Sequence, residues 1–303
     1  MAALRYRKQE EGFLRLSLDE AANPPETAKA VVIPFGLETS VCYGGGTKAG
    51  PEAVIQASPQ LDFFLEEMWC EPFRQYGIAT LETPEIVADH AGALEQLEGL
   101  VEAVLAEGRF PLVLGGEHSL TIGAVRPFIK RHPDLVVVQI DAHADLRDGY
   151  LGQHYSHASA MRRILDAPGV SLISLAIRCI SVEEVAYYET QRDRLTIHFA
   201  KDRKSWDLKE IFAPLRGRPV YLTFDVDGLD ASLMPATGTP DPGGLFFDEA
   251  IDIVRTLAET GNVVGADVVE LAPIPGYHAA EYTVAKLTYK MLSYILAKGQ
   301  DRR

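Results

Sequence analysis

Three residues that can bind metal ions, Asp141, His143 and Asp145, directly follow an apolar run of the sequence. The run, residues 135–140, is short and rich in valine, which favours a strand buried on both faces, as in a parallel sheet. Side chains two residues apart share one face of an extended segment, so all three ligands can point the same way. An isolated aspartate after a strand is more often a turn or capping residue. Three alternating ligands favour a metal site instead.

Further candidate ligands follow two other apolar runs. His118 comes after residues 111–114, within the sequence Gly-Gly-Glu-His-Ser, and Asp225 and Asp227 come after residues 220–224. The carboxyl ends of parallel strands meet at one edge of a sheet, where open α/β sheets bind their ligands. A histidine at one strand end is by itself more often structural. Because His118 follows a predicted strand, as Asp141 does, we expect it to lie beside Asp141, His143 and Asp145.

The candidate ligands are two imidazoles and four carboxylates, without a thiolate. Such ligands suit Mn²⁺, Co²⁺, Ni²⁺ or Fe²⁺ better than a structural zinc site. Six ligands exceed what one ion with an open position needs, whereas two bridged ions about 3.5 to 4 Å apart would use them all. Four carboxylates also balance two divalent charges. The sequence therefore predicts a hydrolase with two metal ions that activate a water molecule.

Alternating strands and helices must position these residues. The alternation predicts an α/β fold, with one parallel sheet and helices on both of its faces. We expect a single domain over residues 30–303, preceded by an N-terminal arm, residues 1–29, that lies on the surface. The predicted strands are 31–35, 76–81, 111–114, 135–140, 172–176, 195–199, 220–224 and 263–269, and the predicted helices are 51–67, 89–107, 122–130, 159–165, 182–191, 248–259 and 280–296.

Two irregular segments lie between the predicted elements. Three glycines at 44–46 precede a helix, but the phosphate-binding patterns Gly-x-Gly-x-x-Gly and Lys-Ser/Thr are absent from this loop, which disfavours a phosphate site. The segment 235–244 holds three prolines and three glycines. It is long enough to form one wall of a pocket.

Composition excludes several classes of function. The chain has 303 residues and a formal net charge of −14, which argues against nucleic acid as a partner and favours a small cationic molecule. Cys42, Cys70 and Cys179 are far apart, as is typical of a reducing compartment. No apolar run approaches the roughly 18 residues of a membrane span, and no signal-peptide core is present. We therefore expect a cytoplasmic protein without a membrane partner.

Three segments together resemble the signature motifs of the ureohydrolase family, which includes arginase, agmatinase, guanidinobutyrase and formimidoylglutamase. They are Gly-Gly-Glu-His-Ser at 115–119, Asp-Ala-His-Ala-Asp at 141–145 and Phe-Asp-Val-Asp-Gly-Leu-Asp at 224–230. The resemblance spans residues 31–296 and implies a three-layer α/β/α fold with an eight-stranded parallel sheet. It also implies two Mn²⁺ per chain, with Co²⁺ or Ni²⁺ as alternatives, and a homo-oligomer, commonly a trimer or hexamer. By position, one ion would be bound by His118, Asp141, Asp145 and Asp225, and the other by Asp141, His143, Asp225 and Asp227.

The resemblance also implies catalytic roles. His157 matches the histidine that shuttles protons, with His154 as a competing candidate. Glu270 matches the carboxylate that binds the guanidinium of the substrate, which suits planar bidentate pairing. Asp227 would take a proton from the attacking water and pass it to the departing amine. The products would be urea and an amine. The departures from the family pattern, Glu117 for Asp, Ala158 for Gly and Ala231 for Pro, remove no ligand but leave the substrate open.

The segment 146–157 bears on the substrate. Arginases bind the amino-acid tail of arginine with an Asn- and Ser/Thr-rich stretch here, whereas this segment has no Asn and one Ser. A site that leaves charged groups unpaired rejects them strongly, so we expect arginine to be a poor substrate. Residues 155–159 and 232–240 look more like agmatinases, including those that accept aminopropylagmatine, and Asp148 would meet a distal ammonium if it faces the pocket.

Other functions stay open at this point. Arg147 would supply the countercharge for an acid-tailed substrate such as 4-guanidinobutanoate. A related amide deacetylase on the same scaffold is disfavoured, because such relatives do not use all six ligands. A catalytically silent subunit that assembles with an active paralogue is disfavoured because the ligands are intact.

Overall fold

The computed structural model describes residues 4–17 and 24–299. Within these residues, eight strands form one sheet in which every pairing is parallel. The strands are β1 (Ala30–Phe35), β2 (Ile78–Thr80), β3 (Phe110–Gly115), β4 (Val136–Ile140), β5 (Ser171–Ile177), β6 (Leu195–Phe199), β7 (Pro219–Asp225) and β8 (Asn262–Val269). Their order in the sheet is β2-β1-β3-β8-β7-β4-β5-β6.

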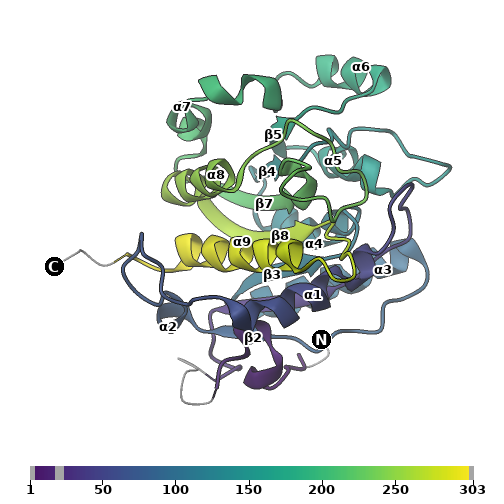
Figure 1. The fold of residues 1–303 in the computed structure, drawn as a ribbon. Helices are drawn as coiled ribbons and strands as arrows, with labels where there is room; N and C mark the ends of the chain where they lie inside the picture. Colours follow the sequence, from purple (N-terminus) through teal and green to yellow (C-terminus); the bar gives the residue numbers. More distant parts are fainter. Residues whose placement is uncertain (1–3, 18–23, 300–303) are drawn as a thin grey trace.

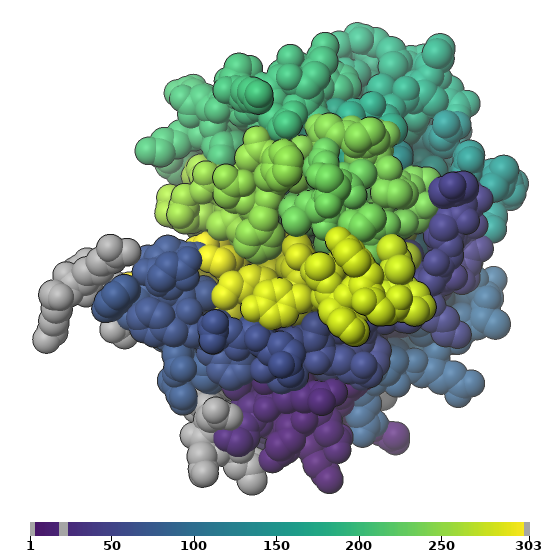
Figure 2. Space-filling model, in the orientation of Figure 1, coloured from purple at the N-terminus to yellow at the C-terminus, as the bar shows by residue number. Residues whose placement is uncertain are grey.

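Helices cover both faces of the sheet, which confirms the predicted α/β/α fold (Figure 1). Helices α1, α8 and α9 pack together on one face, and α3, α4 and α5 on the other. In Figure 2, α9 (yellow) lies between the blue segment that carries α1 and the green segment that carries α8. The helices are α1 (Gly50–Ala57), α2 (Phe73–Tyr76), α3 (His90–Ala106), α4 (Leu120–Arg131), α5 (Ala160–Leu165), α6 (Val182–Thr190), α7 (Leu208–Phe212), α8 (Phe247–Thr260) and α9 (His278–Leu296).

Each face of the sheet has its own hydrophobic core. In β4, the side chains of Val136, Val138 and Ile140 pack into the core that also contains residues of α1, α8 and α9. Val137 points to the opposite face and packs with residues of α3, α4 and α5. This alternation is the two-residue period of a strand. Burial on both faces explains why the strand reads as a continuous apolar run.

The sheet order brings the candidate ligands to one place. Strands β3, β8, β7 and β4 are consecutive in the sheet, although β7 and β8 come much later in the chain than β4. The carboxyl ends of these four strands carry His118, Glu270, Asp225 and Asp141, respectively. The site therefore lies where strands that are neighbours in the sheet are distant in the sequence. Open α/β folds usually bind their ligands at such a position.

The predicted helix over residues 51–67 is wrong in its length. Helix α1 ends at Ala57 and continues only as a 3₁₀ turn, Ser58–Gln60. Pro59 lacks a backbone N–H and restricts the residue before it, which ends a regular helix here. The two short helices α2 and α7 were not predicted.

The N-terminal segment is not simply an arm on the surface. The side chains of Phe13, Leu14 and Leu16 are buried in the core on the α1 face. The backbone N–H of Leu14 donates to the hydroxyl of Ser58 at 2.7 Å, and that of Phe13 donates to Thr80 at 2.8 Å. Residues 1–3 and 18–23, also part of the predicted arm, lie outside the described residues. The boundary of a domain at residue 30 stays a prediction.

Two further findings concern the described part of the chain. None of its helices is both long enough and apolar enough to span a membrane. Its three cysteines are all free thiols.

Candidate metal centre

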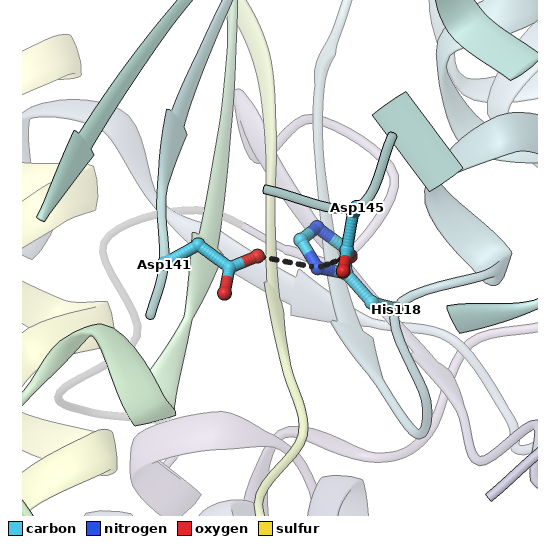
Figure 3. Close-up of side chains that lie close together, drawn as sticks. All are labelled: His118, Asp141 and Asp145. Atoms are coloured by element: carbon cyan, nitrogen blue, oxygen red, sulfur yellow. Dashed lines mark ion pairs between the residues drawn. The ribbon is translucent and has the colours of Figure 1, made fainter. Parts of the chain in front are cut away.

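His118 places a ring nitrogen among three carboxylates. It lies in the turn between β3 and α4, and its Nδ1 is 3.0 Å from Asp141 Oδ2 and 3.1 Å from Asp145 Oδ2 (Figure 3). The same nitrogen is 3.3 Å from Asp225 Oδ2. The other ring nitrogen, Nε2, is 2.8 Å from the hydroxyl of Thr223. Such an outer contact fixes the orientation of a metal-binding imidazole.

The His118 nitrogen that faces the carboxylates has an unusual environment. Among the described residues, His118 Nδ1 is buried without a hydrogen-bond partner of acceptable geometry. A buried polar atom without a partner is rare in proteins and often marks an absent ion or water. Because imidazole nitrogen and carboxylate oxygen are both good ligands for divalent transition ions, the residues present fit a metal ion here.

A second group of ligand atoms lies beside the first. His143 Nδ1 is 3.0 Å from Asp227 Oδ2 and 3.6 Å from Asp141 Oδ1. Asp141 therefore turns one carboxylate oxygen toward His118 and the other toward His143. The two clusters, His118–Asp141–Asp145 and Asp141–His143–Asp227, each have ligand atoms within 4.8 Å of one another. A carboxylate shared in this way suits a pair of ions that it bridges.

The backbone after β4 turns so that its ligands converge. Asp145 has φ of 55°, in the left-handed region that side chains other than glycine rarely adopt. Glu270, at the end of β8, has φ of 69°. Such conformations typically cost about 1–3 kcal/mol each and persist only where the surroundings enforce them, often at functional sites. Both residues were predicted to belong to the site, but the sequence gives no sign of their backbone geometry.

Two supporting residues were missed by sequence reasoning. The side-chain amide of Gln139 donates to Asp141 Oδ2 at 2.8 Å, and the hydroxyl of Thr223 contacts His118 as described above. Gln139 is fully buried in β4, and Thr223 is fully buried in β7. The signal that could have found them is a polar residue inside an otherwise apolar strand, because a buried polar group requires a partner.

The electrostatics of the cluster favour a cation. Burial, together with repulsion from Asp227 and Asp141, raises the pKa of Asp225 well above its ordinary value. Burial and the charge of Asp141 raise the pKa of Asp145 to about 7. Burial would lower the pKa of His143, but the carboxylates of Asp227 and Asp141 outweigh it and raise that pKa. The carboxylates thus compete for protons, and divalent ions would take the place of those protons.

The cluster forms the floor of a cavity. A small inner cavity of about 30 Å³ is lined by His118, His143, Asp225, Asp227 and Glu270, among others. Gly238 and Thr239 also line it, so the loop 235–244 forms part of the wall, as predicted. An outer cavity of about 520 Å³ shares His143, Asp145 and His157 with the inner one and opens to solvent. The arrangement offers a small molecule a path to the candidate metal centre.

The two histidines that competed for the shuttle role lie in different places. His157 lines both cavities. His154 lines neither; its Nδ1 is 2.6 Å from Arg163 Nη1, and its ring packs edge-on against Tyr155. The geometry therefore favours His157 over His154.

Asp148 does not meet the condition for binding a distal ammonium, because it does not face the pocket. Asp148 lines neither cavity, and its carboxylate is 2.5 Å from Arg163 Nη2 and 3.7 Å from Arg162 Nη2. Both arginines are on α5, which comes close to this loop only in the folded protein. Arg147 lines the outer cavity instead and forms an ion pair with Glu183.

Comparison with known proteins agrees with this geometry. The sequence matches the arginase family over residues 28–293. It is 36% identical over 286 residues to N(1)-aminopropylagmatine ureohydrolase of Synechocystis sp., covering 91% of this chain and 92% of the relative. It is 33% identical over 258 residues to agmatinase of Bacillus anthracis, covering 82% and 85%. The structure resembles agmatine ureohydrolase of Thermoplasma volcanium with a TM-score of 0.81 at 30% identity, covering 91% and 92%. The resemblance inferred from three motifs is confirmed, and the chain belongs to the arginase family.

Proposed function

We propose that this protein is a ureohydrolase with two metal ions that hydrolyses a cationic guanidino compound, agmatine or aminopropylagmatine, to urea and an amine or polyamine. The observation that carries the proposal is the position of Asp141 between His118 and His143, two histidines that line the inner cavity together with Glu270. Fold and family membership support the same conclusion.

The ligand sets are the ones implied by the motifs. Manganese is the proposed metal, with Co²⁺ or Ni²⁺ as alternatives. Two bound divalent ions supply a water of lowered pKa and stabilise negative charge that develops on the substrate. His118, Asp141, Asp145 and Asp225 would hold one ion, and Asp141, His143, Asp225 and Asp227 the other.

Glu270 is the proposed guanidinium-binding residue. Its Oε1 accepts a 2.6 Å hydrogen bond from the backbone N–H of His118, which fixes the carboxylate at the floor of the inner cavity. Burial raises the pKa of Glu270 well above its ordinary value, so the ionised form needs a cation beside it. A bound guanidinium meets this need and can pair with the carboxylate through two parallel hydrogen bonds.

Asp227 and His157 are the proposed proton carriers. Asp227 Oδ1 accepts a hydrogen bond from the backbone N–H of Ala142 at 3.0 Å, which holds the carboxylate facing the cavity. In this position Asp227 takes the proton of the attacking water and passes it to the departing amine. Burial lowers the pKa of His157, which favours the neutral imidazole at neutral pH, ready to carry protons between the site and solvent.

The substrate tail would lie in the outer cavity. Because Asp148 is paired with arginines outside the cavity, it is not proposed as the partner of a distal ammonium. Arg147 would favour an acid-tailed substrate such as 4-guanidinobutanoate, but its charge is offset by Glu183. The names of the relatives and the net charge of −14 support a cationic substrate. A homo-oligomer, trimer or hexamer, and a cytoplasmic location stay predictions.

A comparison of four substrates tests the proposal. We expect metal-loaded protein to release urea from agmatine or aminopropylagmatine with a kcat/KM at least about tenfold above that for 4-guanidinobutanoate, and to act poorly on arginine, whose carboxylate would lack a partner. A preference for arginine or 4-guanidinobutanoate would overturn the substrate assignment but not the metal chemistry. Absence of urea with all four compounds would overturn the proposed reaction.

A further inference from the structure

Behind the cavity, the buried carboxylate of Glu117 organises the loop that follows β1. Its two oxygens accept hydrogen bonds from the backbone N–H groups of Thr39 and Ser40, both at 2.6 Å. They also accept from the hydroxyls of Ser40 at 2.8 Å, Ser119 at 2.5 Å and Thr39 at 3.1 Å. The backbone N–H groups of Thr39 and Ser40 can only donate, and the Ser40 hydroxyl donates as well, so the Glu117 carboxylate acts as an acceptor toward Ser40. In the sequence, Glu117 stands out only as a departure from the family pattern.

Ser40 connects this carboxylate to His157. A serine hydroxyl has one proton and two lone pairs. The proton of Ser40 goes to Glu117 Oε1, so both lone pairs are free to accept. One accepts from the backbone N–H of His157 at 2.9 Å. The other faces His157 Nδ1 at 3.1 Å, and this nitrogen must therefore carry the proton of the contact. If the Ser40 hydroxyl instead donated to His157 Nδ1, an oxygen lone pair of Ser40 would face the Glu117 carboxylate 2.8 Å away, and the two would repel each other.

The consequence lies on the other side of the imidazole ring. When Nδ1 of a neutral imidazole carries the proton, Nε2 carries the free lone pair. His157 Nε2 lies 3.7 Å from Cys42 Sγ, and both residues line the inner and outer cavities. Tyr150 packs edge-on against the ring, with centroids 5.8 Å apart. The ring is thus held from behind by Ser40 and from the side by Tyr150, with its basic nitrogen toward the cavity.

We propose that Glu117 and Ser40 are positioning residues that hold His157 in the tautomer with its proton on Nδ1, so that Nε2 is the proton acceptor in the cavity. The inference rests on the proposed function, because it gives His157 its orientation for the proposed shuttle role. His90 lies near the same group of hydroxyls: its Nδ1 is 3.1 Å from the Thr39 hydroxyl, and its Nε2 is 3.0 Å from the Ser119 hydroxyl.

The position of the proton can be measured without an activity assay. Neutron diffraction from deuterated, metal-loaded crystals near neutral pH should show deuterium on His157 Nδ1 and on the Ser40 hydroxyl, the latter directed at Glu117. Deuterium on Nε2 alone, or a Ser40 deuterium directed at Nδ1, would overturn the inference. This result stands whether or not the protein releases urea, so it separates failure of the inference from failure of the proposed function.

Kinetics of matched serine variants provide the second test. Ser40→Ala removes the contact with Nδ1 and should lower kcat at least about tenfold, since a positioned acid–base group typically contributes about 10²–10⁴-fold. KM and the content of two ions should change less than about twofold. Ser40→Thr keeps the hydroxyl and should restore most of kcat.

Ser156→Ala is the control, because Ser156 adjoins His157 but, among the described residues, its buried hydroxyl has no hydrogen-bond partner. Its kcat should stay near that of the wild type. Equal kcat for the Ser40→Ala and Ser156→Ala variants of an active enzyme would contradict the inference. So would a failure of Ser40→Thr to act differently from Ser40→Ala.

Discussion

The backbone N–H of His118 donates a 2.6 Å hydrogen bond to Oε1 of Glu270. The contact joins the turn after β3 to the end of β8, its neighbour in the sheet, and the backbone N–H of Glu270 returns a bond to the carbonyl of Gly116 at 2.8 Å. Gly116 has no room for a side chain, since a Cβ there would lie 2.0 Å from the carbonyl oxygen of Leu37. These two hydrogen bonds therefore fix the proposed metal ligand His118 next to the proposed guanidinium-binding residue Glu270.

Removal of single ligands should reduce metal content by site. We expect wild-type protein to hold two divalent ions per chain, and His118→Ala or Asp227→Ala to lose one of them. Loss of a residue that merely supports a metal ligand typically costs about 10–100-fold, so loss of a ligand should lower kcat/KM by more than about 100-fold. Elemental analysis and urea release measure the two effects. Asp134→Ala, in an exposed position before β4, is the control and should keep both ions. Full activity in either ligand variant would exclude its role.

Replacing the two competing histidines should give opposite results. His157→Phe should lower kcat by about 10²-fold or more while both ions remain bound, because it removes the proton carrier but no ligand. Imidazole added to the buffer should restore part of the rate. His154→Phe should change kcat less than about twofold, because His154 lines neither cavity. The reverse ranking would assign the shuttle to His154.

An ion pair distant from the site predicts a pH-dependent contribution to stability. Burial opposes ionisation of Glu67, but hydrogen bonds from Lys290 and Tyr294 lower the pKa of Glu67 from 4.5 to about 2. Because the folded-state pKa is the lower one, the stabilisation is present above pH 4.5 and is lost as the pH falls toward 2.

Lys290→Met should therefore lower the free energy of unfolding by about 1 kcal/mol at pH 7, a value that allows for solvent screening of Glu67. The difference between wild type and variant should shrink by pH 3. Urea denaturation at both pH values measures it. The metal ligands titrate in the same way in both proteins, so their contribution cancels in the difference between the two free energies of unfolding. An equal difference at both pH values would contradict the assignment.

The N-terminal segment should contribute to stability. Phe13 is 1% exposed, and Phe→Ala in a core typically costs about 3–5 kcal/mol. We expect Phe13→Ala to lower the free energy of unfolding by this amount in urea denaturation. Val182→Ala, at a side chain that is 88% exposed, should change it by less than about 0.5 kcal/mol. Similar small effects from both variants would mean that the segment is only an arm on the surface.

Much of the fold could be predicted because its cause is local. The β4 strand is recognisable from Val136–Ile140 because burial on both faces requires a continuous apolar run. Asp141 and His143 then stand at a strand end, where ligand sites are expected. Gln139 could have been included on the same reasoning, because it interrupts an apolar strand.

Other features depend on contacts between distant parts of the chain. Nothing local indicates that β8 and β7 lie between β3 and β4, so the approach of Glu270 to His118 could not be derived from spacing. Asp148 pairs with Arg163 because α5 packs beside its loop, and the sequence does not reveal this choice of partner. Glu117 and Ser40 are 77 residues apart, and their contact exists only in the folded protein.

Titration of metal-free protein with Mn²⁺, with urea release from agmatine or aminopropylagmatine followed at each step, tests the central claim most directly. The proposed two-metal site predicts that activity is absent without metal and reaches its maximum at two ions per chain. Maximal activity at one ion per chain, or urea release that does not depend on metal, would contradict the account.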